Sequence, residues 1–483
     1  MVLKMKKLTK IIATIGPSSE SEENIAKLIE LGVNIFRFNI KHNDLAWHKE
    51  KITLVKKVAE KKDIAIGTLI DLQGPEIRTV VPNDEIKLQK GEEVFVGTTE
   101  REGKKFTISH PSVLAHLVKD QKVVVEDGRA TFTVGEVFEG GAVLIAENDQ
   151  SLKTKKTFNL PGASYPMPVL TEKDYEAIKM AATIKVDFVA LSFVRTAADV
   201  IDLKKAIKDA NLEARVVSKV ETRIALDNLD AIIEASDGIM VARGDLGIEI
   251  PIEQVPYYQK IMIKKCLERG IPVITATQML TSMATNPYPT RAEVSDIANA
   301  AYDMTDAVML SEESAMGKYP EETVKMMADT VLFSEAQNVV KDTRVIFEYA
   351  SAATEEMICD TAYNLYLQFS NKNEGVGGFV VFSQSGRTGR NISRYRPKAP
   401  IYVFSQSEKV RDGLTMSFGV TPFIQPKLFK ESMQVRVEDM KEAFELLSQK
   451  ESIDRNKYYI LLYGDSWGVE GGVSTVKVIK ISL

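Results

Sequence analysis

The chain has little cysteine and no long apolar run. Only Cys266 and Cys359 occur among 483 residues, far apart and each in an apolar, helix-like context. This spacing excludes a disulfide framework and a cysteine-based zinc site, and predicts two reduced core thiols. No run reaches the roughly 18 apolar residues of a membrane span, and residues 1–7 lack the apolar stretch of a signal peptide. We therefore expect a cytoplasmic protein without a membrane partner.

The chain also lacks an excess of positive charge. Its net charge is −5, so no broad basic field is available to attract a nucleic acid. A phosphate site would have to be a local cluster of lysine and arginine. With 44% hydrophobic and 27% charged residues, the composition is that of a globular protein, and the length predicts about three domains.

The dominant pattern is a strand-like run followed by a helix-like run. Eight short, largely apolar runs without alternation are typical of parallel strands buried on both faces. They cover residues 10–15, 34–39, 65–71, 187–193, 215–220, 238–242, 272–277 and 307–310. Amphipathic segments between them predict helices at 22–31, 170–184, 197–210, 256–269 and 291–304. Eight strands alternating with helices predict a (β/α)8 TIM barrel, with a doubly wound open sheet as the alternative.

Two regions break this pattern. Residues 79–158 contain alternating or β-branched segments separated by glycine turns, which predict a small inserted β domain. After about residue 340, a helix-like segment at 352–369 precedes strand-like runs at 378–382, 401–404, 458–462 and 476–481. We therefore predict a barrel formed by 1–78 and 159–340, an inserted β domain at 79–158, and a C-terminal α/β domain at 341–483.

Polar side chains gather where the predicted barrel strands end. Catalytic residues of (β/α)8 barrels lie at the C-terminal ends of the strands. The residues found there are Arg37, Asn39, Asp71, Arg78, Ser192, Lys219, Glu221, Arg243, Asp245, Thr277 and Ser311. A set this coherent on one face indicates a site rather than scattered surface charge.

The carboxylates of this set indicate a divalent metal. Glu221 and Asp245 end adjacent strands, and such a pair suits Mg²⁺ or Mn²⁺. Lys219 precedes Glu221 by two residues, so both point to the same face of an extended strand. There the lysine can stabilise an enolate or a transferring phosphoryl group. The alternative is that Lys219–Glu221 and Arg243–Asp245 are structural ion pairs.

The remaining groups indicate phosphate and carboxylate chemistry. Arg37 and Arg78 can each bind phosphate in a bidentate manner. Gly244 lies where the backbone can approach a bound carboxylate. Thr277 offers a hydroxyl, or an ordered water, as a proton source.

These residues lie within motifs that resemble the pyruvate kinase family. The motifs are TKIIATIGPSS at 9–19, GPEIR at 74–78, NLPG at 159–162, LTEKD at 170–174, SFVR at 192–195, SKVE at 218–221, MVARGDLG at 240–247, ATQML at 276–280 and PTRAE at 289–293. They follow the family's order, and only together are they specific. The resemblance implies a barrel, a β-barrel lid and a C-terminal regulatory domain. It also implies glycolytic transfer of the phosphoryl group of phosphoenolpyruvate to ADP, giving pyruvate and ATP, by a homotetramer.

The resemblance also implies residue roles. Catalysis would involve Lys219, Arg37, Thr277 and Arg243, and Glu221 with Asp245 would hold Mg²⁺ or Mn²⁺. The substrate would contact Lys219, Gly244, Asp245, Thr277 and Ser192. The nucleotide would lie among Thr14, Pro17, Asn39, His42, Arg78 and Lys156.

The chain departs from the family at the potassium site. Of four ligands, a serine is replaced by Lys41 and a threonine by Leu72, while Asn39 and Asp71 remain. Because an ammonium carries the same charge as potassium, we predict that Lys41 replaces the ion and that K⁺ is not required. Members that dispense with potassium often have lysine in place of the glutamate of the GPE motif, which is retained here as Glu76. The alternative is that Lys41 is a solvated surface lysine.

The C-terminal region resembles the family more loosely. Ser383, Ser385, Arg387 and Thr388 resemble the phosphate-binding loop for sugar-phosphate activators, and their chemistry suits phosphate. Asp465 and Glu470 in a later loop would repel a bisphosphate, so a singly phosphorylated effector is favoured over a bisphosphate; a purely structural loop is the alternative.

Two other functions remain open. One is a lyase or aldolase on a related barrel, and the other is a catalytically impaired homologue with a sensing or assembly role. Glu312, which replaces a family glycine after the eighth strand, bears on full activity.

Overall fold

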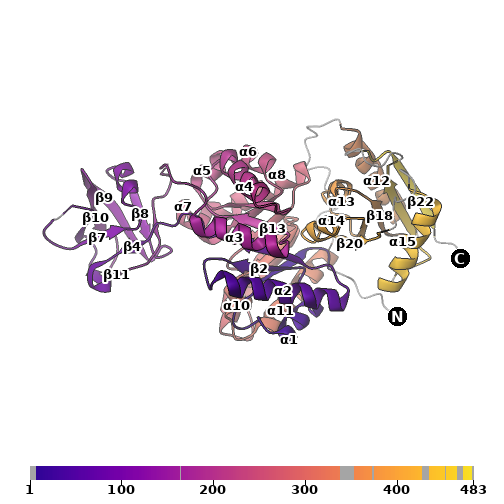
Figure 1. The fold of residues 1–483 in the computed structure, drawn as a ribbon, viewed down its shortest axis with the longest axis horizontal. Helices are drawn as coiled ribbons and strands as arrows, with labels where there is room; N and C mark the ends of the chain where they lie inside the picture. Colours follow the sequence, from indigo (N-terminus) through magenta and orange to yellow (C-terminus); the bar gives the residue numbers. More distant parts are fainter. Residues whose placement is uncertain are drawn as a thin grey trace.

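The computed structural model describes residues 7–99, 101–163, 165–337, 353–372, 375–426, 435–451, 453–464 and 472–480. Along its length the protein has a β body at one end, a barrel in the middle and an α/β body at the other end (Figure 1). The domain boundaries at 78 and 158 stay predictions, and the boundary at 340 lies outside the described residues.

Eight parallel strands close into the central barrel, in the order β1-β17-β16-β15-β14-β13-β3-β2. Their bounds are β1 Lys10–Thr14, β2 Ile35–Asn39, β3 Gly67–Asp71, β13 Phe188–Leu191, β14 Arg215–Val220, β15 Gly238–Ala242, β16 Val273–Ala276 and β17 Ala307–Leu310. Each lies within two residues of its predicted bounds. Side chains alternate between the barrel interior, such as Ile12, and the helix layer, such as Ile11. The barrel prediction is confirmed, and the open-sheet alternative is wrong.

Helices surround the barrel and fix the loops at its upper end, the end at which the eight strands have their C-termini. They are α1 Glu22–Glu30, α2 Leu45–Lys62, α3 Glu172–Ile184, α4 Ala197–Asp209, α5 Arg223–Asp227, α6 Leu229–Ala235, α7 Arg243–Glu249, α8 Val255–Arg269, α9 Arg291–Tyr302, α10 Glu312–Ala315 and α11 Pro320–Ala336, with 3-10 turns η3 Ile252–Gln254 and η4 Thr281–Ala284. Thr171 and Asp174 form a capping box at α3. The Asp174 carboxylate also accepts the Gln73 N–H at 2.9 Å, which ties down the loop after β3.

The helices also account for both cysteines. Cys266 on α8 and Cys359 in the C-terminal body are buried and free, as predicted. Burial raises the pKa of both thiols. No helix within the described ranges is long and apolar enough to cross a membrane.

The inserted body is all β, as predicted. It contains β4 Thr79–Val80, η1 Pro82–Asp84, β5 Glu85–Leu88, β6 Glu93–Gly97, β7 Lys105–Ile108, η2 Pro111–His116, β8 Lys122–Val125, β9 Ala130–Phe138, β10 Gly141–Ala146, β11 Gln150–Lys153 and β12 Phe158–Asn159. Seven strands form one sheet, and β11 pairs with β5 in a second. Where the chain enters and leaves this body, Arg78 and Thr157 form an antiparallel bridge. The insert is therefore joined to the barrel by a paired, two-stranded stalk.

The C-terminal body is an α/β domain. Its elements are α12 Thr354–Ser370, β18 Val376–Phe382, α13 Arg387–Ser393, β19 Ile401–Ser405, α14 Glu408–Gly413, β20 Val420–Ile424, α15 Val437–Lys450, β21 Tyr458–Tyr463 and β22 Thr475–Lys480. The sheet order is β20-β19-β18-β21-β22, with β22 antiparallel to β21. The predicted strands are confirmed, and β20 is additional; positions 352 and 481 of the predicted elements lie outside the described residues.

The C-terminal body closes the lower end of the barrel, the end at which the eight strands begin. Met416, from the turn after α14, is buried in the barrel's interior cluster together with Leu69, Val217 and Met240. Beside it, the Asp306 carboxylate at the start of β17 accepts hydrogen bonds from the Phe418 N–H at 2.9 Å and from the Arg396 guanidinium at 2.6 Å. The two bodies therefore share a core and a buried ion pair.

The same end of the barrel contains a carboxyl group with a raised pKa. Burial, with a contribution from Asp412, raises the pKa of Asp187 to about 6 despite the opposing charge of Lys56. Its carboxylate accepts the Thr68 N–H at 2.8 Å and the Thr68 hydroxyl at 2.6 Å. Because the folded-state pKa is the higher one, protonated Asp187 favours the fold below about pH 4, and this stabilisation is lost as pH rises through about 6.

We therefore expect Asp187→Asn to stabilise the protein more at pH 7.5 than at pH 5. An asparagine oxygen keeps the acceptor for Thr68 but cannot ionise. The difference in unfolding free energy between variant and wild type should grow by about 1 kcal/mol over this interval. Melting temperatures of both proteins at the two pH values measure it, and a difference independent of pH would show that Asp187 titrates normally.

Candidate active site

Lys219 lies at the centre of the polar cluster at the upper end of the barrel. Its Nζ lies 2.7 Å from Glu221 Oε1 and 3.3 Å from Asp71 Oδ1, and it donates a hydrogen bond of 2.8 Å to Ser192 Oγ. These partners come from β14, β3 and the end of β13. Burial alone would lower the pKa of Lys219, but Asp71, Glu221 and Asp245 together raise it. The lysine is therefore a fixed, permanently charged ammonium.

Arg37 extends this network on β2. Its Nε donates to Asp71 Oδ2 at 2.9 Å, and a terminal nitrogen donates to Thr14 Oγ1 at 2.9 Å. Burial acts to raise the pKa of Asp71, but the charges of Lys219 and Arg37 outweigh it and lower the pKa. Asp71 is therefore an ionised carboxylate that holds two cations side by side.

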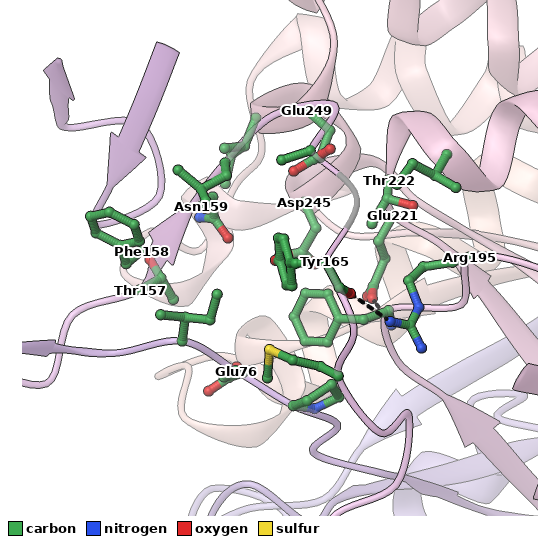
Figure 2. A pocket seen from close by; sticks show the side chains of 18 residues that line it. Glu76, Thr157, Phe158, Asn159, Tyr165, Arg195, Glu221, Thr222, Asp245 and Glu249 are labelled. Carbon is green, nitrogen blue, oxygen red and sulfur yellow. Dashed lines mark hydrogen bonds between the residues drawn. The ribbon is translucent and has the colours of Figure 1, made fainter. Parts of the chain in front are cut away.

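Glu221 and Asp245 line the same pocket (Figure 2). Glu221 Oε2 accepts the Phe193 N–H at 2.7 Å, and Phe193 has a left-handed φ of 56°. Burial raises the pKa of Glu221 to about 7 and raises that of Asp245, with Lys219 opposing both shifts. Two carboxylates forced together in a buried site would be stabilised by a bound cation.

The residues present fit a divalent metal ion. Within the described ranges, the Asp245 carboxylate has neither a hydrogen-bond donor nor an ion-pair partner, so its oxygens are available as ligands. Within those ranges no group of three or more His, Cys, Asp or Glu side chains is placed to hold a metal ion. Mg²⁺ is commonly held by one or two carboxylates, with substrate oxygens and water completing the shell. Glu221 and Asp245 supply that number.

Thr277 directly follows β16 and has a left-handed φ of 67°, a strained conformation for a β-branched residue. Its hydroxyl donates to the Ala276 carbonyl at 2.6 Å and accepts the Gly244 N–H at 2.9 Å. The hydroxyl is therefore aligned by the first turn of α7, which also carries Asp245.

Arg243 points away from the carboxylate pair. It donates to the Ala276 and Thr277 carbonyls at 3.1 and 2.6 Å and to Asp296 Oδ1 at 2.7 Å. Among the described residues its ion-pair partner is Asp296 and not Asp245, whereas the Lys219–Glu221 pair is present. Arg243 therefore holds the backbone at Ala276 and Thr277 and does not contact the carboxylate pair.

A basic cleft lies between the barrel and the inserted β body. Its lining is Lys41, Arg78, Glu126, Asp127, Arg129, Lys155, Lys156 and Thr157. Arg78 donates to the Lys155 carbonyl at 2.9 Å, and Lys156 Nζ lies 2.7 Å from Glu126. The sequence analysis identified Arg78 and Lys156 but missed Arg129 and Lys155. The basic run at 153–156 was a signal for Lys155, whereas nothing in the sequence around Arg129 marked it.

Other predicted nucleotide residues lie differently. Thr14 is buried, and its hydroxyl donates to the Leu310 carbonyl at 2.8 Å while accepting Arg37. Pro17 and His42 are exposed, and Asn39 Oδ1 accepts the Lys41 N–H at 3.2 Å. Thr14 therefore supports Arg37 and does not line the basic cleft.

The Lys41 ammonium lies on Glu76, with Nζ 2.5 Å from Oε1. The other Glu76 oxygen pairs with Arg78. Asp71 is already engaged by Arg37 and Lys219, so Lys41 does not occupy the position between Asn39 and Asp71. Leu72 is buried, and its carbonyl accepts the Ser192 hydroxyl at 2.8 Å.

The loop proposed for an effector is engaged within the domain. Ser383 Oγ accepts the Gly386 N–H at 3.0 Å. Glu355 on α12 accepts the Thr388 hydroxyl at 3.0 Å and lies 3.3 Å from Arg387. The Glu355 carboxylate thus binds two of the four groups predicted to bind phosphate, and Ser385 lies in the same turn. Asp465 and Glu470 lie outside the described residues; Glu312 is exposed.

Comparisons with known proteins agree with this geometry. The family model for the pyruvate kinase barrel domain matches residues 6–324, and that for the pyruvate kinase alpha/beta domain matches residues 365–479. A pyruvate kinase of Staphylococcus saprophyticus is 37% identical over 476 residues, covering 97% of this chain and 80% of that protein. Pyruvate kinases of Staphylococcus epidermidis and Staphylococcus aureus are 40% identical over 422 residues, covering 86% of this chain and 72% of each relative. The chain therefore belongs to the pyruvate kinase family of phosphotransferases.

Proposed function

We propose that the protein transfers the phosphoryl group of phosphoenolpyruvate to ADP, giving pyruvate and ATP in glycolysis. The observation that carries this proposal is the charged Lys219, held between Asp71 and Glu221 and beside the available carboxylate of Asp245. Phosphoryl transfer needs positioning and charge neutralisation more than covalent participation of the protein. A cluster of fixed cations next to a metal-binding carboxylate pair supplies both.

Each group then has a role. Glu221 and Asp245 hold Mg²⁺ or Mn²⁺, which neutralises charge on the oxygens of the substrates when bound. Lys219 stabilises charge on the transferring phosphoryl group and on the enolate oxygen, and Arg37 contacts the phosphoryl group. Ser192 orients Lys219 through its 2.8 Å hydrogen bond, and the Gly244 backbone lies at the carboxylate end of the substrate.

The enolate that remains must gain a proton at carbon to become pyruvate. We assign delivery of this proton to the Thr277 hydroxyl or to a water that it orders. Arg243 is a positioning residue, because its guanidinium holds the carbonyls of Ala276 and Thr277. The strained φ of Thr277 depends on such support.

We place ADP in the basic cleft between the barrel and the β body, where Arg78 and Lys156 face Lys41. Of the other residues implied for the nucleotide, Pro17 and His42 lie at the surface, Asn39 supports the Lys41 backbone, and Thr14 acts through Arg37. The β body would then act as a lid that excludes water from the phosphoryl donor. Pyruvate formation from phosphoenolpyruvate and ADP, measured in a coupled assay, tests the proposal. No pyruvate would instead favour the impaired homologue.

We further propose that the enzyme does not require K⁺. The Lys41 ammonium on Glu76 brings a fixed positive charge to the glutamate of the GPE motif, the position where potassium-independent relatives often carry lysine. Burial raises the pKa of Asp245, and the charge of Lys41 opposes this shift. Lys41 therefore acts electrostatically on a residue of the proposed metal site. Of the two retained ligands, Asn39 would then position the Lys41 backbone, and Asp71 would hold Arg37 and Lys219.

We expect K⁺ to change wild-type activity less than about twofold at constant ionic strength, and Lys41→Met to lower kcat about tenfold. The lost charge is partly exposed, so the effect is smaller than for a buried group. Steady-state assays in sodium, potassium and tetramethylammonium salts measure this. Lys49→Met, an exposed lysine of α2, is the control. A many-fold activation of the wild type by K⁺ would contradict the proposal.

Three family properties complete the proposal. They are a cytoplasmic location, a homotetramer, and a singly phosphorylated effector at Ser383, Ser385, Arg387 and Thr388. Exposed Ile252 on η3 and exposed Tyr257 on α8 support a subunit contact. An effector at this loop would have to displace the Glu355 carboxylate from Arg387 and Thr388.

A further inference from the structure

Two arginines meet where the barrel rests on the C-terminal body. Arg215 begins β14, and Arg390 lies on α13. Each donates a long hydrogen bond to the same acceptor, the Ser385 carbonyl, at 3.4 Å from Arg215 and 3.5 Å from Arg390. The two guanidinium groups therefore converge on one point from two different bodies.

Neither arginine is neutralised there. Within the described residues no carboxylate oxygen lies within 4.0 Å of either guanidinium. The nearest acidic influence is Asp237, whose carboxylate accepts the Val216 N–H at 2.9 Å and lies 3.5 Å from Lys204. Glu355 is engaged by Arg387 and Thr388, and Asp306, which lines a cavity with Arg390, is engaged by Arg396. The contact region between the barrel and the C-terminal body, called the seam below, thus holds two positive charges, and no carboxylate among the described residues pairs with either of them.

Both side chains are partly buried, which makes the lack of a counter-charge unfavourable. Among the described residues the buried Arg215 Nε has no hydrogen-bond acceptor, and the side chain is packed against Gly413, where an added Cβ would lie 2.4 Å from that nitrogen. Burial and then the charge of Arg215 lower the pKa of Arg390. A guanidinium nevertheless stays protonated in proteins, so the unfavourable charge has to be relieved by an anion and not by loss of a proton.

We propose that Arg215 and Arg390 form a binding site for a small oxyanion of the phosphate class, between the barrel and the C-terminal body. Paired guanidinium groups suit this chemistry because each presents several N–H donors in a planar fork. Arg390, but not Arg215, also lines a small cavity between the two bodies, together with Ser393, Ser417 and the Asp306 carboxylate that Arg396 neutralises. In the part of the chain that the structure describes, the buried Ser417 hydroxyl of this cavity has no partner, so it is a further donor on the Arg390 side of the site.

This site is distinct from the other two. It lies at the lower end of β14, whereas Lys219 lies near the upper end of the same strand, so it does not depend on the proposed phosphotransfer. It adjoins the proposed effector groups, because both arginines donate to the Ser385 carbonyl, but it uses neither Arg387 nor Thr388, which bind Glu355. An anion held here would neutralise the base of the strand that carries the central lysine.

Thermal unfolding with inorganic phosphate as the probe tests the site. The full chain is dialysed free of phosphate, and ionic strength is held constant with sodium gluconate. We expect saturating phosphate to raise the wild-type melting temperature by about 2 °C or more. Arg215→Met and Arg390→Met should each lose this shift, and Arg387→Met, an arginine of the same loop that already has a partner, should keep it.

The opposite patterns overturn the proposal. A shift that survives in both variants but disappears in Arg387→Met would place the anion in the effector loop, and no shift in the wild type would mean that no anion binds. A second measurement needs no ligand: removing one of two repelling charges should leave Arg215→Met at least as stable as the wild type without phosphate, and a large loss would contradict this. Tighter binding of a sugar monophosphate than of inorganic phosphate would identify the natural source of the oxyanion.

Discussion

Lys219→Met is expected to lower kcat for pyruvate formation by about 10³-fold or more, because the variant loses the charge that neutralises the transferring phosphoryl group. The ammonium is buried and bonded to Asp71, Glu221 and Ser192, so no water or neighbouring side chain can take its place. Methionine keeps most of the length of the side chain and removes the ammonium group with its charge and its N–H donors. Single-turnover and steady-state assays with saturating Mg²⁺ measure the effect.

The fold must be monitored separately, because the variant leaves three acidic groups facing one another. Circular dichroism and the melting temperature report this, and added Mg²⁺ should stabilise Lys219→Met more than the wild type. Lys325→Met, an exposed lysine of α11 that pairs with Asp329, is the matched control and should keep full activity. A folded Lys219→Met enzyme with more than about a tenth of wild-type kcat would exclude the assigned role.

Arg396→Ala should destabilise the protein by about 3–5 kcal/mol, the usual cost of removing one partner from a buried ion pair. Arg396 and Asp306 are only 5% and 4% exposed, and their 2.6 Å contact joins the C-terminal body to the start of β17. The substitution leaves Asp306 charged and buried. The guanidinium also donates to the Met304 carbonyl at 2.8 Å, so that acceptor is left unsatisfied as well.

Thermal unfolding compares this variant with a surface pair of the same seam. Lys450 on α15 lies 2.5 Å from Asp63, but the two side chains are 33% and 76% exposed. Lys450→Ala should therefore cost at most about 1 kcal/mol. Equal losses for the two variants would mean that the Arg396–Asp306 pair does not hold the two bodies together.

The barrel strands could be predicted because each is a short run buried on both faces, which leaves a continuous apolar signal. β20 was missed for a physical reason: Pro422 interrupts its pattern, and proline is tolerated only because β20 is an edge strand of its sheet. The helix α7 was also missed. Gly244 and Gly247 make its sequence a poor helix former, and a contact from Thr277 to the Gly244 N–H supports it.

The sequence predicted which residues form the candidate site better than it predicted the contacts of their side chains. The ends of parallel strands meet at one end of a barrel, so Lys219, Glu221 and Asp245 could be grouped from the sequence alone. The partner of a long side chain could not be predicted, because it depends on packing across the fold. Arg243 reaches Asp296, 53 residues away, and Lys41 reaches Glu76, 35 residues away.

Met416 gives the order of synthesis a structural meaning. All eight barrel strands precede this methionine in the chain, yet it completes the floor of their interior. A nascent chain that has just finished β17 therefore has its hydrophobic centre open to water at one end. It stays uncovered until the ribosome has delivered the turn after α14, and during that interval the half-made protein is exposed to aggregation. The C-terminal body, which is synthesised last, therefore completes the hydrophobic core of the barrel, which is synthesised before it.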